Sequence, residues 1–213
     1  MEALRELRAS GGPAVRAFRG AMGSFPTGVT VVTVATGDGA MYGVTVNSFS
    51  SVSLDPMLVL VCLNENSRGI GLIERAAAFA VNVLSAGQQD VCRWFADRHR
   101  PAGAMMFDGV PFEPGLTGCP VLADATASFE CRLWQSHPAG DHLIVLGEVV
   151  ALIHRPELEP LIFHDGILGA GLRAVYQASI RWAGVKTASV CVLDAPERET
   201  AISGTGSGVT RSR

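Results

Sequence analysis

The sequence predicts a mainly β protein, an antiparallel barrel with a few helices packed outside it. Glycine accounts for 24 of the 213 residues and apolar residues for 48%, which is typical of a turn-rich β protein with a sizeable core. The candidate strands are short, joined by hairpin-type turns and interrupted by only two or three candidate helices. Regular βαβ alternation is missing, as are a GxGxxG motif and a P-loop, which disfavours a Rossmann domain and a Walker-type NTPase.

The N-terminal part of the chain predicts an arm, a helix and a hairpin. Residues 1–13 end in Ser-Gly-Gly-Pro and indicate a flexible arm, and residues 14–22 predict one short helix. Residues 29–36 are dense in Val and Thr and predict a strand. After a Gly-Asp-Gly turn, residues 41–49 predict the returning strand of the hairpin.

The middle of the chain alternates short strands and helices. Residues 57–63 form a continuous apolar run and predict a strand that is buried on both faces. Ser67 is a candidate cap for a short helix, and residues 79–84 predict the next strand. Ser85 and the residue three places on, a Gln, form a capping box that predicts a helix over residues 86–97.

The second half of the chain predicts a loop, two long strands and a tail. Residues 98–120 contain scattered Gly and Pro and predict a long loop. Residues 127–135 and 142–153 predict two strands joined by a Pro-Ala-Gly-Asp turn, and residues 161–163 a short one. We therefore expect one domain over residues 14–170 and a C-terminal extension over residues 171–213, which is Ser/Gly/Thr-rich at its end and partly disordered.

Charge and cysteine content exclude several classes of protein. The net charge is −3 and no basic run occurs, which argues against nucleic-acid binding. The five cysteines include no CxxC pair, so we expect neither a disulfide framework nor a metal site. The N-terminus has no apolar signal region and no apolar run is long enough to span a bilayer, so we expect a cytoplasmic protein without membrane contact.

The segment of residues 45–53 is the most unusual in the chain, because it ends an apolar strand with many hydroxyls and one amide. Such a set can hold a phosphate by hydrogen bonds without net charge. The same residues could also form a polar strand-to-turn transition that satisfies its own backbone, which composition alone favours. The composition does not exclude either interpretation.

Several ordered motifs carry a resemblance to a known family. Residues 25–33 read FPTGVTVVT, residues 43–56 read GVTVNSFSSVSLDP, and LVLVCL, FAVNVL and Gly-Asp-His follow in order. Together they cover about residues 15–168, and the chain resembles the short-chain flavin reductases, the reductase components of two-component flavin monooxygenases. The resemblance implies a split β-barrel of Greek-key type, a homodimer, FMN or FAD as the flavin, and NADH or NADPH as the reductant.

The resemblance also implies which residues hold the nucleotides. Pro26 and Thr27 would lie beside the flavin ring, and Ser51 and Ser53 near the ribityl phosphate. The remaining candidates are those that the resemblance implies to bind some part of the flavin: Thr45, Val46, Asn47, Ser48, Cys62, Leu63, Asn64, Ser67, Arg68, Phe79, Asn82 and His164. Ser67 and Arg68 would close on the phosphate.

Two of these positions also have simpler interpretations. Phe79 is better explained by core packing, and Asn82 is equally well explained by an amide bonded to a neighbouring backbone. His142, in Gly-Asp-His, is the candidate catalytic residue. A lone histidine is often structural, but the resemblance places His142 by the nicotinamide. Because hydride passes directly between the two rings, we expect His142 to orient the nicotinamide, not to transfer a proton.

Two departures from the family pattern affect single contacts. Ile167 and Leu168 stand where the family often has an aromatic residue, which removes a stacking contribution. Met57 stands where the family has a second proline, and a methionine can fill that space.

The sequence thus predicts an NAD(P)H:flavin oxidoreductase that supplies reduced flavin to a partner monooxygenase. One alternative is a split-barrel oxidase that retains its flavin and oxidises its own substrate. The other is a non-catalytic flavin- or heme-binding module. A heme module would need an axial ligand and cationic groups for the propionates, and the chain has five histidines and no basic cluster.

Overall fold

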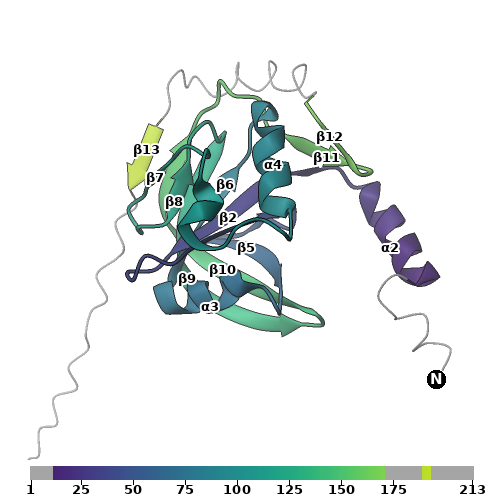
Figure 1. Ribbon diagram of the computed structural model, residues 1–213, viewed down its shortest axis with the longest axis horizontal. Coiled ribbons are helices and arrows are strands. Elements are labelled where there is room, and N and C mark those ends of the chain that lie inside the picture. The colour runs from purple at the N-terminus through teal and green to yellow at the C-terminus, as the bar shows by residue number, and fades with distance from the viewer. Residues whose placement is uncertain (1–11, 171–188, 193–213) are drawn as a thin grey trace, which may run out of the picture.

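A computed structural model describes residues 12–170 and 189–192. All strand pairs in these residues are antiparallel, and the main sheet has the order β3-β2-β6-β9-β10-β5-β4, with β13 added to β10 (Figure 1). The strands of this sheet are β2 (Thr30–Ala35), β3 (Met41–Val46), β4 (Ser50–Leu54), β5 (Met57–Asn64), β6 (Ala78–Val83), β9 (Ala127–Ala139), β10 (His142–His154) and β13 (Ser189–Val192). The mainly β, antiparallel prediction is confirmed.

Shorter elements flank this sheet. The helices are α2 (Pro13–Gly23), α3 (Arg68–Ala76), α4 (Gln89–Ala96), and the 3₁₀ turns η1 (Ala86–Gln88) and η2 (Gly103–Phe107). A three-stranded sheet joins β1 (Thr27–Gly28), β11 (Ile162–His164) and β12 (Ile167–Gly169), and a two-stranded one joins β7 (Phe112–Pro114) and β8 (Pro120–Leu122).

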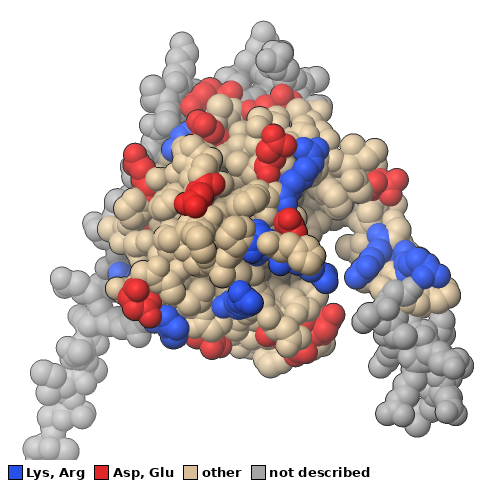
Figure 2. Space-filling view, viewed as in Figure 1, with Lys and Arg blue, Asp and Glu red and all other residues tan. Residues whose placement is uncertain are grey.

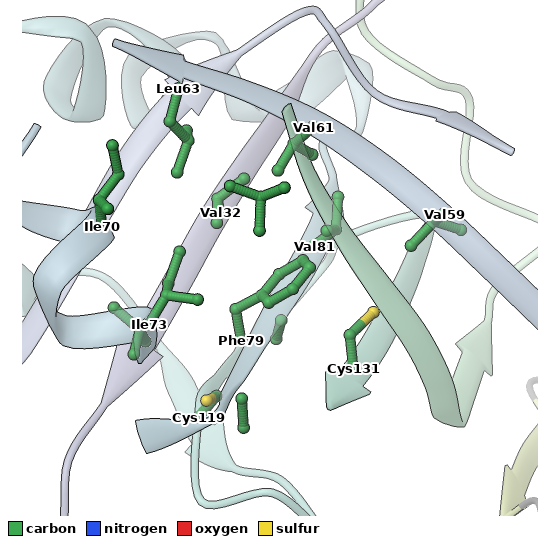
Figure 3. Close-up of a cluster of buried hydrophobic side chains, with 14 of the residues drawn as sticks. Val32, Val59, Val61, Leu63, Ile70, Ile73, Phe79, Val81, Cys119 and Cys131 are labelled. Atoms are coloured by element: carbon green, nitrogen blue, oxygen red, sulfur yellow. The ribbon is translucent and has the colours of Figure 1, made fainter. Parts of the chain in front are cut away.

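The main sheet encloses a core, because strands far apart in its order contribute to one cluster. Val32 of β2, Val61 of β5, Phe79 of β6 and Val145 of β10 are all essentially inaccessible to solvent and belong to that cluster. Figure 3 shows Val32, Val61 and Phe79 pointing toward one another from their separate strands. A sheet whose early and late strands share one interior is coiled into a barrel.

A second core lies between the barrel and its outer helices. It is built from Val31, Leu84, Phe95 of α4, Phe107 of η2 and further apolar residues around them. Strand β2 therefore has apolar neighbours on both faces. The prediction of two-sided burial for residues 57–63 is wrong, because only alternate residues of β5 are buried.

The helix predictions hold with small shifts of their ends. The helix expected at residues 14–22 is α2, and the Ser67 hydroxyl caps α3 by accepting the Gly69 N–H (3.3 Å). The capping box of Ser85 and Gln88 begins η1, which continues into α4. None of the described helices has the length and apolar character needed to cross a membrane.

The loop and strand boundaries needed more correction. The strand expected to run to residue 49 ends at Val46, and a separate strand β4 follows. The expected loop of residues 98–120 contains η2, β7 and the start of β8. The flexible arm was expected over residues 1–13, but Pro13 already begins α2. Residues 1–11 of that arm and the partly disordered tail expected within residues 171–213 lie outside the described residues, apart from strand β13.

Candidate functional site

A cavity of about 730 Å³ lies where the end of β3 approaches β1 and the end of α2. No charged residue lines it, and its lining combines apolar side chains with an amide and hydroxyls: Met22, Phe25, Pro26, Thr27, Gly28, Thr30, Asn47, Ser48, Phe49, Ser50 and Val83. Four predicted site residues, Pro26, Thr27, Asn47 and Ser48, are brought together here. A mostly apolar cavity with a few polar groups is typical of a site for a small ring-shaped ligand.

Two polar groups of this cavity are available to a ligand. The Thr27 hydroxyl oxygen is buried and has no hydrogen-bond partner among the described residues. Asn47 is exposed and its amide makes no hydrogen bond in the same part of the chain. Because buried polar groups are almost always paired, Thr27 fits a ligand that completes its hydrogen bond.

Ser48 holds the cavity wall in place. Its hydroxyl accepts the Cys62 N–H (2.9 Å) and donates to the Cys62 carbonyl (3.1 Å). These two bonds fasten the segment between β3 and β4 onto β5. Ser48 lines the cavity, but its donor is already used by the protein.

Thr45 and Val46 support the cavity without lining it. The Thr45 hydroxyl donates to the Cys92 carbonyl of α4 (2.8 Å), and Val46 packs against the barrel core. Ser51 and Ser53 lie on β4 and do not line the cavity, and the Ser53 hydroxyl bonds to the backbone of Asp55. These four residues position the segment rather than offering donors inside the cavity.

Phe79 and Asn82 are both completely buried in the core, so the structure does not bring them to a cavity. The Asn82 amide donates to the Val31 carbonyl and the Thr33 hydroxyl, and its oxygen accepts the Leu122 N–H and the Ser128 hydroxyl. All of its hydrogen-bonding capacity serves the fold. The core interpretation holds for both residues, and their placement along the flavin does not fit this position.

The candidates of β5 are distributed over three environments. Leu63 is buried in the barrel core, whereas Cys62 is half-buried. Asn64 is exposed, and its amide donates to the Asp141 carbonyl (3.1 Å). The end of β5 is thereby tied to the turn that precedes β10.

His142 begins β10 and pairs with Asn64 in the sheet register. Its Nδ1 lies 2.7 Å from the Asp141 carboxylate, and the histidine side chain is 43% exposed. The hydrogen bond and charge of His142 lower the pKa of Asp141 below its ordinary value. A carboxylate can only accept, so the Nδ1 nitrogen carries the proton, and Nε2 makes no hydrogen bond among the described residues. His164 is exposed on β11, the strand that pairs with β1.

Ser67 and Arg68 line a separate cavity of about 290 Å³, together with Tyr42, Asn66, Arg98, Arg100, Pro101 and Met106. We call this second cavity the arginine pocket. Tyr42 lies near the start of β3 and Asn47 follows its end, so the two cavities are roughly 17 Å apart along that strand. Sequence reasoning missed Arg98 and Arg100, although the Arg-His-Arg run in an expected loop was a visible signal.

Comparisons with known proteins agree with the motifs. Residues 22–171 match the model of the flavin reductase like domain. The chain is 44% identical over 150 residues to an NADH-dependent FAD reductase of Streptomyces globisporus, covering 70% of this chain and 81% of that protein. It is 44% identical over 159 residues to the FMN reductase (NADH) SmoA of Agrobacterium fabrum, covering 75% and 87%.

A solved structure supports the same assignment. BorF, the flavin reductase component of a bacterial two-component tryptophan halogenase, superposes with a TM-score of 0.69 at 39% identity, covering 73% of this chain and 97% of BorF. The split-barrel fold expected from the motifs is therefore confirmed. With its matched domain, its relatives and its fold in agreement, this chain belongs to the flavin reductase-like domain family.

Proposed function

We propose that this protein is an NAD(P)H:flavin oxidoreductase that binds the flavin ring in the 730 Å³ cavity. The observation that carries the proposal is the buried Thr27 hydroxyl without a partner in the described chain, beside the free amide of Asn47. A flavin ring offers an apolar body and a polar edge to such a lining. When bound, the flavin accepts a hydride from the nicotinamide, and the protein supplies binding and orientation.

His142 is proposed to orient the nicotinamide. The Asp141 carboxylate fixes the imidazole through Nδ1, and Asn64 holds the backbone of the same turn. The Nε2 nitrogen, which has no partner in the described part of the chain, can then hydrogen-bond a carboxamide group. No proton transfer by the histidine is needed.

NADH is the proposed reductant, because relatives are named as NADH-dependent FAD and FMN reductases. The proposed acceptor of the reduced flavin is a partner monooxygenase, because a relative from Rhodococcus jostii, 38% identical over 151 residues, is the reductase subunit of a flavin-dependent monooxygenase. Cys62, Cys92, Cys119 and Cys131 are free thiols, which suits the reducing cytoplasm we propose as the location of the protein.

A homodimer is also proposed. Helix α2 stands away from the barrel (Figure 1) and has no buried residue. Phe18, Met22 and Phe25 on and after this helix are 54–68% exposed. An isolated helix of this length is only marginally stable in water, so a second copy of the chain that covers this apolar face would account for it.

The reductase proposal is tested by mixing the protein with NADH or NADPH and excess FMN, FAD or riboflavin. We expect flavin-dependent loss of nicotinamide absorbance with many turnovers of added flavin. A flavin that stays bound while added flavin is not turned over would instead support an oxidase. Absence of any flavin-dependent oxidation would leave only the binding-module alternative.

The cavity assignment is tested separately with Asn47→Ala. Loss of this amide should weaken flavin binding by about 1–3 kcal/mol, because it removes a hydrogen bond to a polar ligand edge. Flavin affinity is measured by fluorescence titration. Gln135→Ala, a polar truncation outside both cavities, is the control. An unchanged affinity for Asn47→Ala would place the flavin ring elsewhere.

A further inference from the structure

Strand β10 is long, and two different strands share one of its edges. Strand β9 pairs with β10 from His142 to His154 and so occupies one edge throughout. On the other edge, β5 pairs with β10 only as far as Glu148, and β13 pairs with it from Ala151 to His154. Without β13, the second half of β10 would be an open edge, with unpaired backbone N–H and C=O groups on that side.

The sequence of this half of β10 would make an open edge prone to pairing with another molecule. Residues 149–153 read VVALI and contain no charge, proline or glycine, and three of the five are β-branched. Figure 2 shows acidic and basic side chains scattered over one face of the molecule, and such charges oppose association. A short, uncharged apolar segment at an open edge is instead a template for strand addition.

The other two edges of the main sheet are protected. At the β3 edge, the Gly43 N–H donates to the Met106 sulfur (3.1 Å), and the Gly43 carbonyl accepts from Arg100 (2.8 Å). At the opposite end of the sheet, β4 has five residues, three of them serines, and Pro56 follows shortly after it. A short, polar strand with a proline nearby hinders strand addition. The second half of β10 instead pairs with β13.

Strand β13 comes from a part of the chain that the flavin reductase like domain does not include. The match to that domain ends at residue 171, and β13 begins at Ser189. Figure 1 shows β13, in yellow, on the opposite side of the molecule from β12, which is the strand that precedes it in the chain. The C-terminal extension therefore adds a strand to a barrel whose other strands belong to the family domain.

The added strand is itself a poor template for further pairing. It has only four residues. In the sequence, Lys186 precedes it closely, and Asp194 and Pro196 follow it. Charges and proline that flank a short strand oppose the addition of another one. Replacing a long apolar edge by a short one with charged flanks should keep the protein from associating.

We propose that the C-terminal extension protects the β10 edge, because β13 of the same chain occupies a strand-addition site that would otherwise accept a second molecule. The occupant is residues 189–192, in the antiparallel register that pairs Val192 with Ala151 and Ser189 with His154. This role is independent of the reductase function, since no residue paired with β13 lines the ring cavity.

The test uses the full-length chain with Val190→Pro and Cys191→Pro combined. Neighbouring residues of a strand direct their N–H groups to opposite edges, so one of these two prolines removes an N–H that faces β10. Hydrogen exchange is followed by mass spectrometry. In the unaltered protein the amides of residues 151–154 should be protected, and in the variant those that face β13 should exchange at least about tenfold faster.

Sedimentation velocity measures the second consequence. The double variant should form species larger than those of the unaltered protein, and their proportion should rise with concentration. Circular dichroism checks that its barrel is folded. Ser203→Pro combined with Gly204→Pro is the matched control, because it places two prolines in the same extension outside β13. Its exchange and its mass should equal those of the unaltered protein.

A synthetic peptide with the sequence of residues 187–194 provides a rescue. Added in excess to the double variant, it should slow exchange of the β10 amides again and reduce the larger species, because the site is then refilled. The same peptide with prolines at the positions of Val190 and Cys191 should do neither.

Three results would overturn the inference. One is fast exchange of residues 151–154 in the unaltered protein, or equal exchange in the double variant, since β13 would then protect nothing. The second is faster exchange in the folded variant without any larger species. The third is a fall in mass of the variant, which would mean that β13 pairs with the β10 edge of a second copy of the chain.

Discussion

Asn82 shows how one residue type can suggest a ligand contact and serve the fold instead. Its amide connects β2, through Val31 and Thr33, to the backbone of Leu122 and to the Ser128 hydroxyl of β9. No surface of the side chain is left for a ligand. A polar residue in an apolar strand is compatible with either role, and only its neighbours in space distinguish the two.

Asn82→Ala should therefore destabilise the protein by about 3 kcal/mol, because several buried partners lose their hydrogen bonds together. Urea unfolding at equilibrium measures the change, and flavin affinity of the folded protein should stay the same. Asn66→Ala, an exposed amide truncation, is the stability control. If the variant instead kept normal stability but bound flavin weakly, Asn82 would have to contact the flavin.

The Asp141–His142 pair should make the stability of the fold depend on pH. The pKa of Asp141 is lowered mainly by its hydrogen bond to His142. A carboxyl with a lowered folded-state pKa stabilises the fold above its unfolded pKa, and this contribution is lost as the pH falls through the folded pKa. His142→Ala should raise the pKa of Asp141 toward its ordinary value, as measured by NMR titration of the carboxyl carbon. An unchanged pKa would mean that the pair does not form in solution.

At the scale of elements, close approaches between strands depend on glycine. A Cβ on Gly147 of β10 would lie 2.5 Å from the Phe79 ring and 2.7 Å from the Cys131 Cβ. A Cβ on Gly43 of β3 would lie 2.5 Å from the Phe95 ring of α4. Gly147 therefore marks a close contact inside the barrel core, and Gly43 marks one between the barrel and the outer helix α4.

Gly147→Ala should consequently lower the free energy of unfolding by about 2 kcal/mol through overpacking. Gly71→Ala is the matched control, since a Cβ there meets nothing within 4 Å and Gly71 lies within α3. The control should be neutral or stabilising by up to about 1 kcal/mol. Thermal unfolding measures both variants, and equal melting temperatures would contradict the close contact of Gly147 with Phe79.

Elements with a local chemical signal could be predicted, and those without one could not. Ser67 and the Ser85–Gln88 capping box marked two helix starts because capping depends on neighbouring residues. Strand β4 was missed because it is a short, serine-rich edge strand whose alternating apolar residues, Val52 and Leu54, are exposed and do not face the core. Strands β7 and β8 have three residues each and exist through their pairing with one another.

At the scale of the whole molecule, the exposed apolar face of α2 predicts the oligomeric state. We expect sedimentation equilibrium to give twice the chain mass of 22.4 kDa. Phe18→Asp should shift the protein toward the monomer, because a charge cannot be buried unpaired in an interface. Leu116→Asp, at an exposed apolar residue near β7, should remain dimeric. A Phe18→Asp protein with unchanged mass would show that α2 is not at the interface.

The candidate site was predictable in part for a physical reason. Pro26, Thr27, Asn47 and Ser48 meet in one cavity because they lie at the ends of neighbouring elements, next to β1 and β3. Ser67 and Arg68 belong to a second cavity, and Arg98 and Arg100 join them only because the segment after α4 folds back over Tyr42. Residues brought together by long-range contacts leave no spacing pattern in the chain.

The sequence by itself determined the antiparallel β class, the helix starts and the family, since these follow from local periodicity, capping and ordered motifs. The tertiary structure decided which polar residues remain free for a ligand. The Asn82 and Ser48 side chains are consumed by hydrogen bonds across strands, whereas the Thr27 hydroxyl is left unpaired among the described residues. Whether a buried polar group is satisfied depends on neighbours distant in sequence, and only the folded chain defines them.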